Sequence, residues 1–231
     1  MEPTPRSVNE LVEQRILQWM AEQRRSEPAA RPAPFHPIVT ISRQAGACGT
    51  ELGRRVAQRM GFRLWDQELV QQVASRDGSI DQLARVVDEH THNAVEELLS
   101  SILMGDAFTG EGYVWRLRTV IETLAATGNA VVVGRGAQFV VKPDVALRVR
   151  VVASTESRLA NLMAERGLAE RAARAEAERV DRERIAFVKN QYHRDAADPA
   201  AYDLVLSTSS LTLDQAADIV TSAHRTKFGP G

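Results

Sequence analysis

Much that would mark an extracellular, membrane-spanning or nucleic-acid-binding protein is missing from this sequence. Its 231 residues include one cysteine, Cys48, so no disulfide can form within the chain, as is usual in a reducing compartment. No stretch reaches the ~18 apolar residues of a membrane span, and the first residues lack the apolar core of a signal peptide. The 29 Lys and Arg nearly balance the 30 Asp and Glu, which argues against a strongly basic nucleic-acid binder. We therefore expect a cytoplasmic protein with no membrane and no nucleic-acid partner.

The composition that remains is that of a folded globular chain with an appendage at its start. Hydrophobic residues make up 44% and charged residues 26%, close to the average of globular domains. Apolar residues recur at helical spacing over residues 7–25, after a capping-box pattern, and predict a helical appendage over 1–27. Four prolines predict an extended linker over residues 28–37. The helix either packs on the main domain or contacts a partner, including a second copy of the chain in a homodimer.

Strand and helix patterns alternate through residues 38–231, which we predict to be the main domain. Short apolar and β-branched runs predict strands at 38–41, 62–65, 130–133, 145–151 and 204–206. Helical patterns separate these strands, including a helical insert over about 67–128 and a long Ala/Arg/Glu helix that begins near residue 168. Strands that are separated by helices pair in parallel, so the sequence predicts an α/β fold with a parallel sheet of about five strands flanked by helices.

The strongest chemical signal lies where the first predicted strand meets the first predicted helix. Residues 41–52 are typical of a strand, a glycine-bearing loop and a helix, an arrangement that directs loop N–H groups and a helix N-terminus at an anion. The phosphate-loop pattern G-x-x-x-x-G-K-S/T also requires a lysine and a hydroxyl. With Thr50 as that hydroxyl, Gly49 stands at the lysine position, and Cys48 and Arg43 stand at the two glycine positions.

Several blocks from residue 38 onward resemble the cytidylate kinase-like family, a branch of the P-loop nucleoside monophosphate kinases. They are the altered phosphate loop at 41–49, the strand 61–66 that ends in Asp66, the block 131–136 that contains Arg135, the arginine-bearing segment 178–184, and the final strand with its loop at 203–211. The order and spacing of the blocks carry the resemblance. It implies a P-loop NTPase-type fold with a lid over about 168–195.

The resemblance also implies ATP-dependent phosphoryl transfer to a nucleoside monophosphate, with CMP or dCMP as the first expected acceptor and ATP and Mg²⁺ as cofactors. Such transfer depends on positioning and on neutralising charge, so the missing lysine needs a replacement. Arg43 is the first candidate, because it enters the same loop and its guanidinium suits phosphate. Asp66 and Arg135 match acceptor-binding residues. The remaining implied site residues are Gly46, Ala47, Cys48, Gly49, Thr50 and Glu51 for the donor phosphates, Thr50 also for Mg²⁺, and Arg179, Arg182 and Arg184 as catalytic lid arginines.

Departures from the family pattern leave the acceptor and the activity open. Gly136 replaces an aspartate that helps to read the nucleotide in cytidylate kinases, and Gln67 stands where an arginine is common. The alternatives are a catalytically degenerate nucleotide-binding regulatory module and a kinase with a non-nucleotide small-molecule acceptor. Arg54 and Arg55, on the first helix of the domain, are further candidates for the missing charge.

Two other features are interpreted without a functional role. His90 and His92 point to different faces of a helix and have no further ligand nearby, so they do not predict a metal site. A helix N-terminus lowers a thiol pKa, but no base is paired with Cys48 in the sequence. We interpret Cys48 as a small residue in the place of a glycine.

Overall fold

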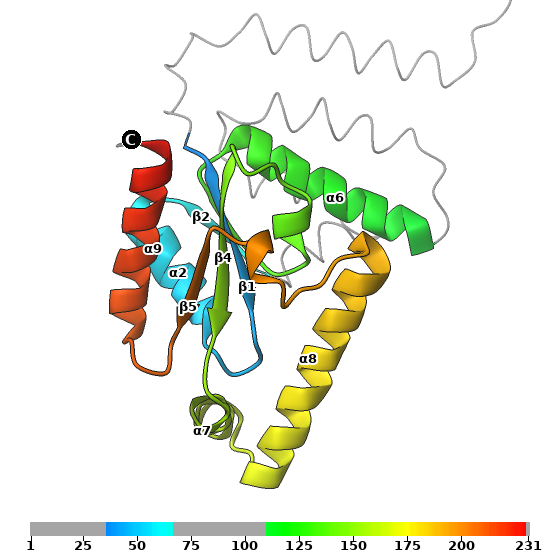
Figure 1. Ribbon diagram of the computed structural model, residues 1–231, viewed down its shortest axis with the longest axis vertical. Coiled ribbons are helices and arrows are strands. Elements are labelled where there is room, and N and C mark those ends of the chain that lie inside the picture. Colours follow the sequence, from blue (N-terminus) through cyan, green and yellow to red (C-terminus); the bar gives the residue numbers. More distant parts are fainter. Residues whose placement is uncertain (1–35, 67–109, 230–231) are drawn as a thin grey trace, which may run out of the picture. The chain divides into compact units, whose positions relative to one another are not determined.

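A five-stranded parallel sheet forms the centre of the computed structural model, which describes residues 36–66 and 110–229 (Figure 1). The strand order is β2-β3-β1-β4-β5, and every neighbouring pair is parallel. The strands are β1 (Ile38–Arg43), β2 (Arg63–Trp65), β3 (Ala130–Val133), β4 (Ala146–Val152) and β5 (Leu204–Ser207). The predicted fold class, a parallel sheet of about five strands flanked by helices, is confirmed.

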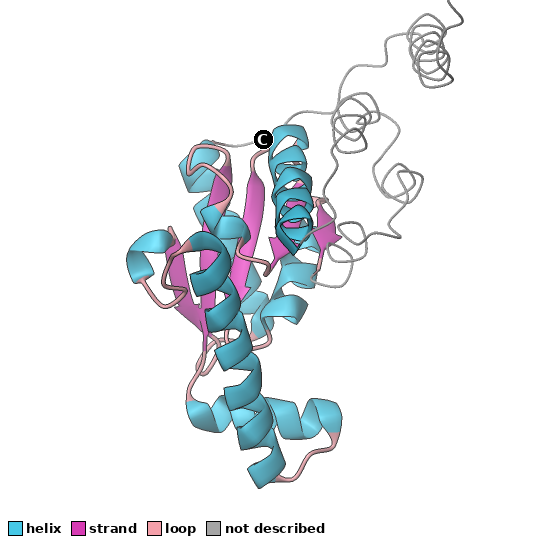
Figure 2. Ribbon diagram, turned by 90° about the vertical axis from the view of Figure 1, so that its right-hand side faces the viewer, coloured by secondary structure: helices cyan, strands magenta, loops and turns pink. Residues whose placement is uncertain are grey.

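Helices cover both faces of this sheet (Figure 2). One face packs on α2 (Gly49–Met60) and α9 (Leu213–Phe228), and the other packs on α6 (Gly110–Thr127). Helices α7 (Thr155–Arg166) and α8 (Glu170–Tyr192) follow β4 and pack on each other, and short helical turns η2 (Ala137–Phe139) and η3 (Pro199–Ala201) lie between longer elements. The outer helices therefore leave the carboxyl ends of the strands, where β1 leads into α2, facing α7 and α8.

Two separate cores explain why these segments form strands. All six residues of β1 are buried, and those of β3 are buried as well, as expected for parallel strands that are covered on both faces. Val39, Ile41 and Leu147 lie in the core shared with α2 and α9, whereas Ile38 and Val132 lie in the core shared with α6. Because successive side chains of a strand point to opposite faces of the sheet, one strand contributes residues to both cores.

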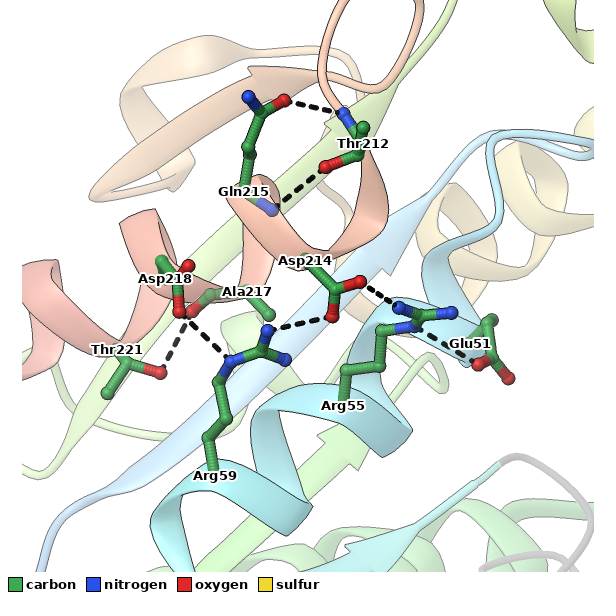
Figure 3. A network of polar contacts seen from close by, with 9 residues as sticks. All are labelled: Glu51, Arg55, Arg59, Thr212, Asp214, Gln215, Ala217, Asp218 and Thr221. Carbon is green, nitrogen blue, oxygen red and sulfur yellow. Dashed lines mark hydrogen bonds and ion pairs between the residues drawn. The ribbon is translucent and has the colours of Figure 1, made fainter.

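The helix ends follow local capping rules. Ser154 caps α7 by accepting a hydrogen bond from the Ser157 N–H, and the helix stops at Gly167 in a left-handed conformation. Thr212 and Gln215 form a reciprocal capping box at the start of α9 (Figure 3). These capping residues are of the types that usually mark helix ends in a sequence.

Some sequence predictions lie outside the described residues. They are the helical appendage 1–27, most of the linker 28–37, and the first part of the insert 67–128, which includes Gln67, His90 and His92. Within the described ranges, no helix is long and apolar enough to span a membrane. The same ranges contain no cluster of three or more His, Cys, Asp or Glu that could hold a metal ion.

Candidate phosphate-binding site

The loop between β1 and α2 makes a tight backbone turn into the helix. Two of its residues are left-handed, Gly46 with φ of 75° and Cys48 with φ of 54°, and Cys48 caps α2 without a side-chain hydrogen bond. A side chain at Gly46 would collide with the carbonyl oxygen of Arg158, so only glycine fits there. The predicted donor-site residues 46–51 form the turn into α2 and the first residues of that helix. Among them, Thr50 is half-buried.

The side chain of Arg43 begins beneath this loop and ends at the neighbouring strand. Its stem lies against Gly49, where an added Cβ would be 2.5 Å from the Arg43 Cβ and 2.9 Å from its Cγ. Its guanidinium lies beside Gly134, at the end of β3, where an added Cβ would be 3.1 Å from Cζ. The residue is only 8% exposed. Arg43 therefore places a buried positive charge at the carboxyl edge of the sheet. Its side chain runs past residue 49, which is the position of the lysine in the phosphate-loop pattern.

Other predicted site residues surround the Arg43 guanidinium. Burial is the largest of the causes that together lower the pKa of Arg43 to about 9. The positive charges of Arg184 and Arg135 contribute to this lowering, and the negative charge of Asp66 opposes it. Nη1 of Arg184 donates a hydrogen bond to the Arg43 carbonyl oxygen at 3.3 Å. The structure thus brings Arg43, Arg135, Arg184 and Asp66 together, although they come from four separate segments of the sequence.

The region around Arg135 differs from the pattern of a cytidylate kinase. Arg135 is left-handed, with φ of 55°, and its Cζ lies 5.9 Å from the ring centroid of Phe187. The hydroxyl of Tyr192 donates to the Arg135 carbonyl oxygen at 2.8 Å. A side chain at Gly136 would collide with the Tyr192 ring, whose Cδ2 would be 2.9 Å from an added Cβ. An aspartate therefore does not fit at position 136 while Tyr192 stays in place.

The three predicted lid arginines of α8 point in different directions. Arg179 is exposed and pairs with Glu176 at 2.8 Å and with Glu183 at 2.6 Å. Arg182 is exposed and lies 3.8 Å from Glu178. Only Arg184 is turned toward the phosphate loop, as described above. The catalytic role of Arg179 and Arg182 stays a prediction.

Residues that sequence reasoning did not single out hold the backbone of the loop. Oδ1 of Asp181 accepts a hydrogen bond from the Ala45 N–H at 2.8 Å, and the same carboxylate pairs with Arg158. Nε of Arg158 donates to the Ala45 carbonyl oxygen at 2.7 Å, and Nδ2 of Asn161 donates to the Gly46 carbonyl oxygen at 2.8 Å. The helices α7 and α8 therefore fix the conformation of the loop from outside. The Arg/Glu periodicity of α8 could not single out Asp181, because the loop residue that it binds, Ala45, is 136 residues away in sequence.

The residue that follows β5 also holds the loop. The hydroxyl of Thr208 donates to the Ala47 carbonyl oxygen at 3.1 Å. This contact joins the loop to the segment 203–211, the last of the blocks that carry the family resemblance. Residues 44–47 are thus supported from both the α8 side and the β5 side.

The two arginines considered as alternatives to Arg43 are engaged elsewhere. Arg55 pairs with Asp214 of α9 at 2.6 Å and with Glu51 at 3.3 Å, and Arg54 also pairs with Glu51. Arg59 extends this network to Asp214 at 2.7 Å and to Asp218 at 3.0 Å (Figure 3). The network ties the exposed sides of α2 and α9 together. The Glu51 carboxylate, predicted to contact donor phosphates, takes part in it.

Burial raises the pKa of the Cys48 thiol, and the negative charges of Glu165 and Glu51 add to this rise. The Sγ atom lies 3.9 Å from the Gly46 carbonyl oxygen. A thiol with a raised pKa is a poor nucleophile at neutral pH. This environment supports the interpretation of Cys48 as a small residue in a turn.

Known proteins are similar to this chain in sequence or in fold. The model of the family described as "Cytidylate kinase-like family" matches residues 38–210. A crystal structure of an uncharacterized protein from Eubacterium ventriosum superimposes with a TM-score of 0.64 at 17% identity, covering 83% of this chain and 99% of that one. Shikimate kinase from Bacteroides thetaiotaomicron superimposes with a TM-score of 0.45 at 11% identity, covering 82% and 97% of the two chains.

One curated protein shares a stretch of sequence with this chain. It is a uronate isomerase of Corynebacterium glutamicum, which is 30% identical over 105 residues, or 45% of this chain. The matched stretch spans 20% of the isomerase, so the chain covers about a fifth of the length of that relative.

Proposed function

Because this chain belongs to the cytidylate kinase-like family, we propose that it transfers the terminal phosphoryl group of ATP·Mg²⁺ to a small acceptor, with CMP or dCMP as the first acceptor to test. An oxygen of the acceptor attacks the γ-phosphorus, the bond from that phosphorus to the β,γ-bridging oxygen breaks, and ADP leaves with the electron pair. The reaction needs positive charge near the γ-phosphate more than it needs covalent chemistry from the protein.

The observation that carries this proposal is the course of the Arg43 side chain. It occupies the space beside Gly49 and delivers a buried guanidinium to the edge of the sheet between the loop and Arg135. A phosphoryl group in transfer between a donor on the loop and an acceptor near Asp66 would pass this charge. We therefore assign to Arg43 the role of the absent phosphate-loop lysine.

The other residues take the remaining roles in the proposal. The N–H groups at the start of α2 bind the donor phosphates, because a helix N-terminus favours anions. Mg²⁺, when bound, would offset the charge of those phosphates, and the half-buried hydroxyl of Thr50 suits its oxygen-rich coordination. Arg184 adds charge from the lid side, and Asp66 with Arg135 orients the acceptor. Arg179 and Arg182 would need to leave their ion pairs to contribute.

Measurement of acceptor-dependent ADP release tests the proposal. With a panel of nucleoside monophosphates, we expect turnover with CMP or dCMP. Arg43→Ala should lower kcat by about 10²- to 10³-fold, the usual effect of removing one group that stabilises transition-state charge. Arg174→Gln is the matched control, since Arg174 is an exposed arginine of the same lid. Unchanged turnover in Arg43→Ala would remove Arg43 from the mechanism.

A second candidate acceptor is a small metabolite that is not a nucleotide. It is favoured by Tyr192, which fills the space of the aspartate that reads the nucleotide in cytidylate kinases. Turnover with a phosphorylatable sugar or acid, and none with nucleoside monophosphates, would select this candidate. A nucleotide-dependent rise in melting temperature without any turnover would instead identify a regulatory binding module.

A further inference from the structure

Arg150 is a charged residue that the proposed reaction does not use. It lies on β4, two residues before the strand ends, and is half-buried. Its Nη1 donates to the hydroxyl of Ser42 at 2.7 Å, and its Cζ lies 5.9 Å from the ring centroid of Tyr202. In the sheet, β4 borders β1 on one side, and β3 and then β2 lie on the other side. Asp66 follows the end of β2, and Arg135 lies two residues after the end of β3. Arg150 therefore lies across β1 from the proposed acceptor residues.

Arg184 reaches the same end of β1 from the lid. It is half-buried and binds the carbonyl oxygen of Arg43, the residue after Ser42. Within the described part of the chain, neither Arg150 nor Arg184 forms an ion pair with a carboxylate. Burial lowers the pKa of Arg184, and although Asp181 opposes this, the positive charge of Arg150 adds to the lowering. The positive charges at this end of β1 therefore repel one another.

This arrangement contrasts with that of the other arginines. Arg171, Arg194 and Arg225 are exposed, where water screens their charge. Many others have acidic partners, namely Arg54, Arg55, Arg59, Arg148, Arg158, Arg166, Arg174, Arg179 and Arg182. A half-buried pair of like charges destabilises the fold unless a negative group offsets it. The chemistry that matches two guanidinium forks is an oxyanion.

We propose that Arg150 and Arg184 form an oxyanion subsite on the β4 side of β1, which binds a phosphate or carboxylate group of the acceptor. The hydroxyl of Ser42 and the ring of Tyr202 orient the Arg150 side chain toward it. That the ligand is the acceptor rests on the proposed function, whereas the subsite itself does not. An acceptor that fills this subsite carries an anionic group and is not a neutral molecule.

Calorimetric titration of the full chain with inorganic phosphate tests the subsite. Saturating ATP·Mg²⁺ is present, so that donor phosphates fill the loop. We expect Arg150→Gln to weaken phosphate binding by at least about tenfold, because a charge-assisted bidentate contact is lost. The phosphate affinity of Arg150→Lys should lie between those of the wild type and of Arg150→Gln, because lysine keeps the charge but cannot make a bidentate contact. Arg174→Gln should bind phosphate as the wild type does. A parallel titration with acetate distinguishes a carboxylate-binding from a phosphate-selective subsite.

Equal phosphate affinity in the wild type and in Arg150→Gln would overturn the subsite, and so would an equal weakening in Arg174→Gln. Near-UV circular dichroism verifies that each variant is folded. In the ADP-release assay, Arg150→Gln should raise KM for the acceptor and leave KM for ATP unchanged. Phosphate binding that depends on Arg150, without turnover of any acceptor, would instead refute the proposed function and keep the subsite.

Discussion

Substitution of Gly49 tests whether the Arg43 side chain takes the place of a phosphate-loop lysine. A Cβ at position 49 would lie 2.5 Å from the Arg43 Cβ, well inside van der Waals contact. Overpacking of this kind costs about 1–3 kcal/mol, whereas alanine in a helix is normally favoured over glycine by up to about 1 kcal/mol. We expect Gly49→Ala to lower the free energy of unfolding by about 1–2 kcal/mol, although helix propensity alone would predict that the alanine is stabilising.

A second substitution shows whether Arg43 causes this loss. Arg43→Gly removes the atoms that Gly49→Ala would meet, so the same alanine should be neutral or stabilising in that background. The double-mutant cycle, measured by urea unfolding of the four proteins, should give a coupling energy of about 2 kcal/mol. An equal cost of Gly49→Ala in both backgrounds would refute the contact between the Arg43 stem and the loop.

The same logic extends to activity. The double variant Arg43→Gly with Gly49→Lys exchanges the two residue types and places a lysine where the phosphate-loop pattern has one. We expect the turnover of the double variant to be at least about tenfold higher than that of Arg43→Gly, because the positive charge returns near the donor phosphates. Gly49→Lys alone should be inactive. If the exchange is no more active than Arg43→Gly, the two positions do not share one role.

Two further substitutions test contacts near the loop and at the β5 edge of the sheet. Asp181→Ala deprives the Ala45 N–H and Arg158 of their acceptor, so unfolding free energy should fall by about 2 kcal/mol and KM for ATP should rise, with Asp218→Ala as the exposed control. The second substitution concerns Asp203. Burial raises the pKa of its carboxyl group, but hydrogen bonds from Arg148 and Lys227 outweigh burial and lower the pKa to about 2. Its charge stabilises the fold above its unfolded pKa, by about 1 kcal/mol after solvent screening, and this stability is lost as pH falls from about 4 toward 2. Asp203→Asn should therefore lose less stability over that range; an identical pH dependence would contradict the assignment.

The sheet could be predicted because its signals are local. β1 and β3 are short β-branched runs that helical segments separate, and this pattern permits little besides a buried parallel strand. The limits of α7 could be predicted because Ser154 and Gly167 act within one turn of the helix. The position of the phosphate loop followed from the same strand–glycine–helix pattern.

The details of the site could not be predicted, because they depend on contacts between distant segments. Arg179, Arg182 and Arg184 look alike at helical spacing, and only the packing of α8 turns one of them toward the loop. Nothing near Gly136 in the sequence indicates that Tyr192 occupies the space beside it. Arg150 could not be singled out within the predicted strand 145–151, since the alternation of residues along a strand does not distinguish a solvent-facing arginine from one covered by other elements.

The supports of the phosphate loop also bear on how the protein matures during synthesis. The loop at residues 44–47 is held by Asp181 and by Thr208, which the ribosome adds 136 and 161 residues after Ala45 and Ala47. Contacts of such long separation form late, because a long segment must close before they can exist. A nascent chain that stops before β5 therefore carries the loop without the Thr208 contact, and one that stops before α8 also lacks the Asp181 contact. Tight nucleotide binding would then distinguish a fully translated kinase-like domain from a truncated one.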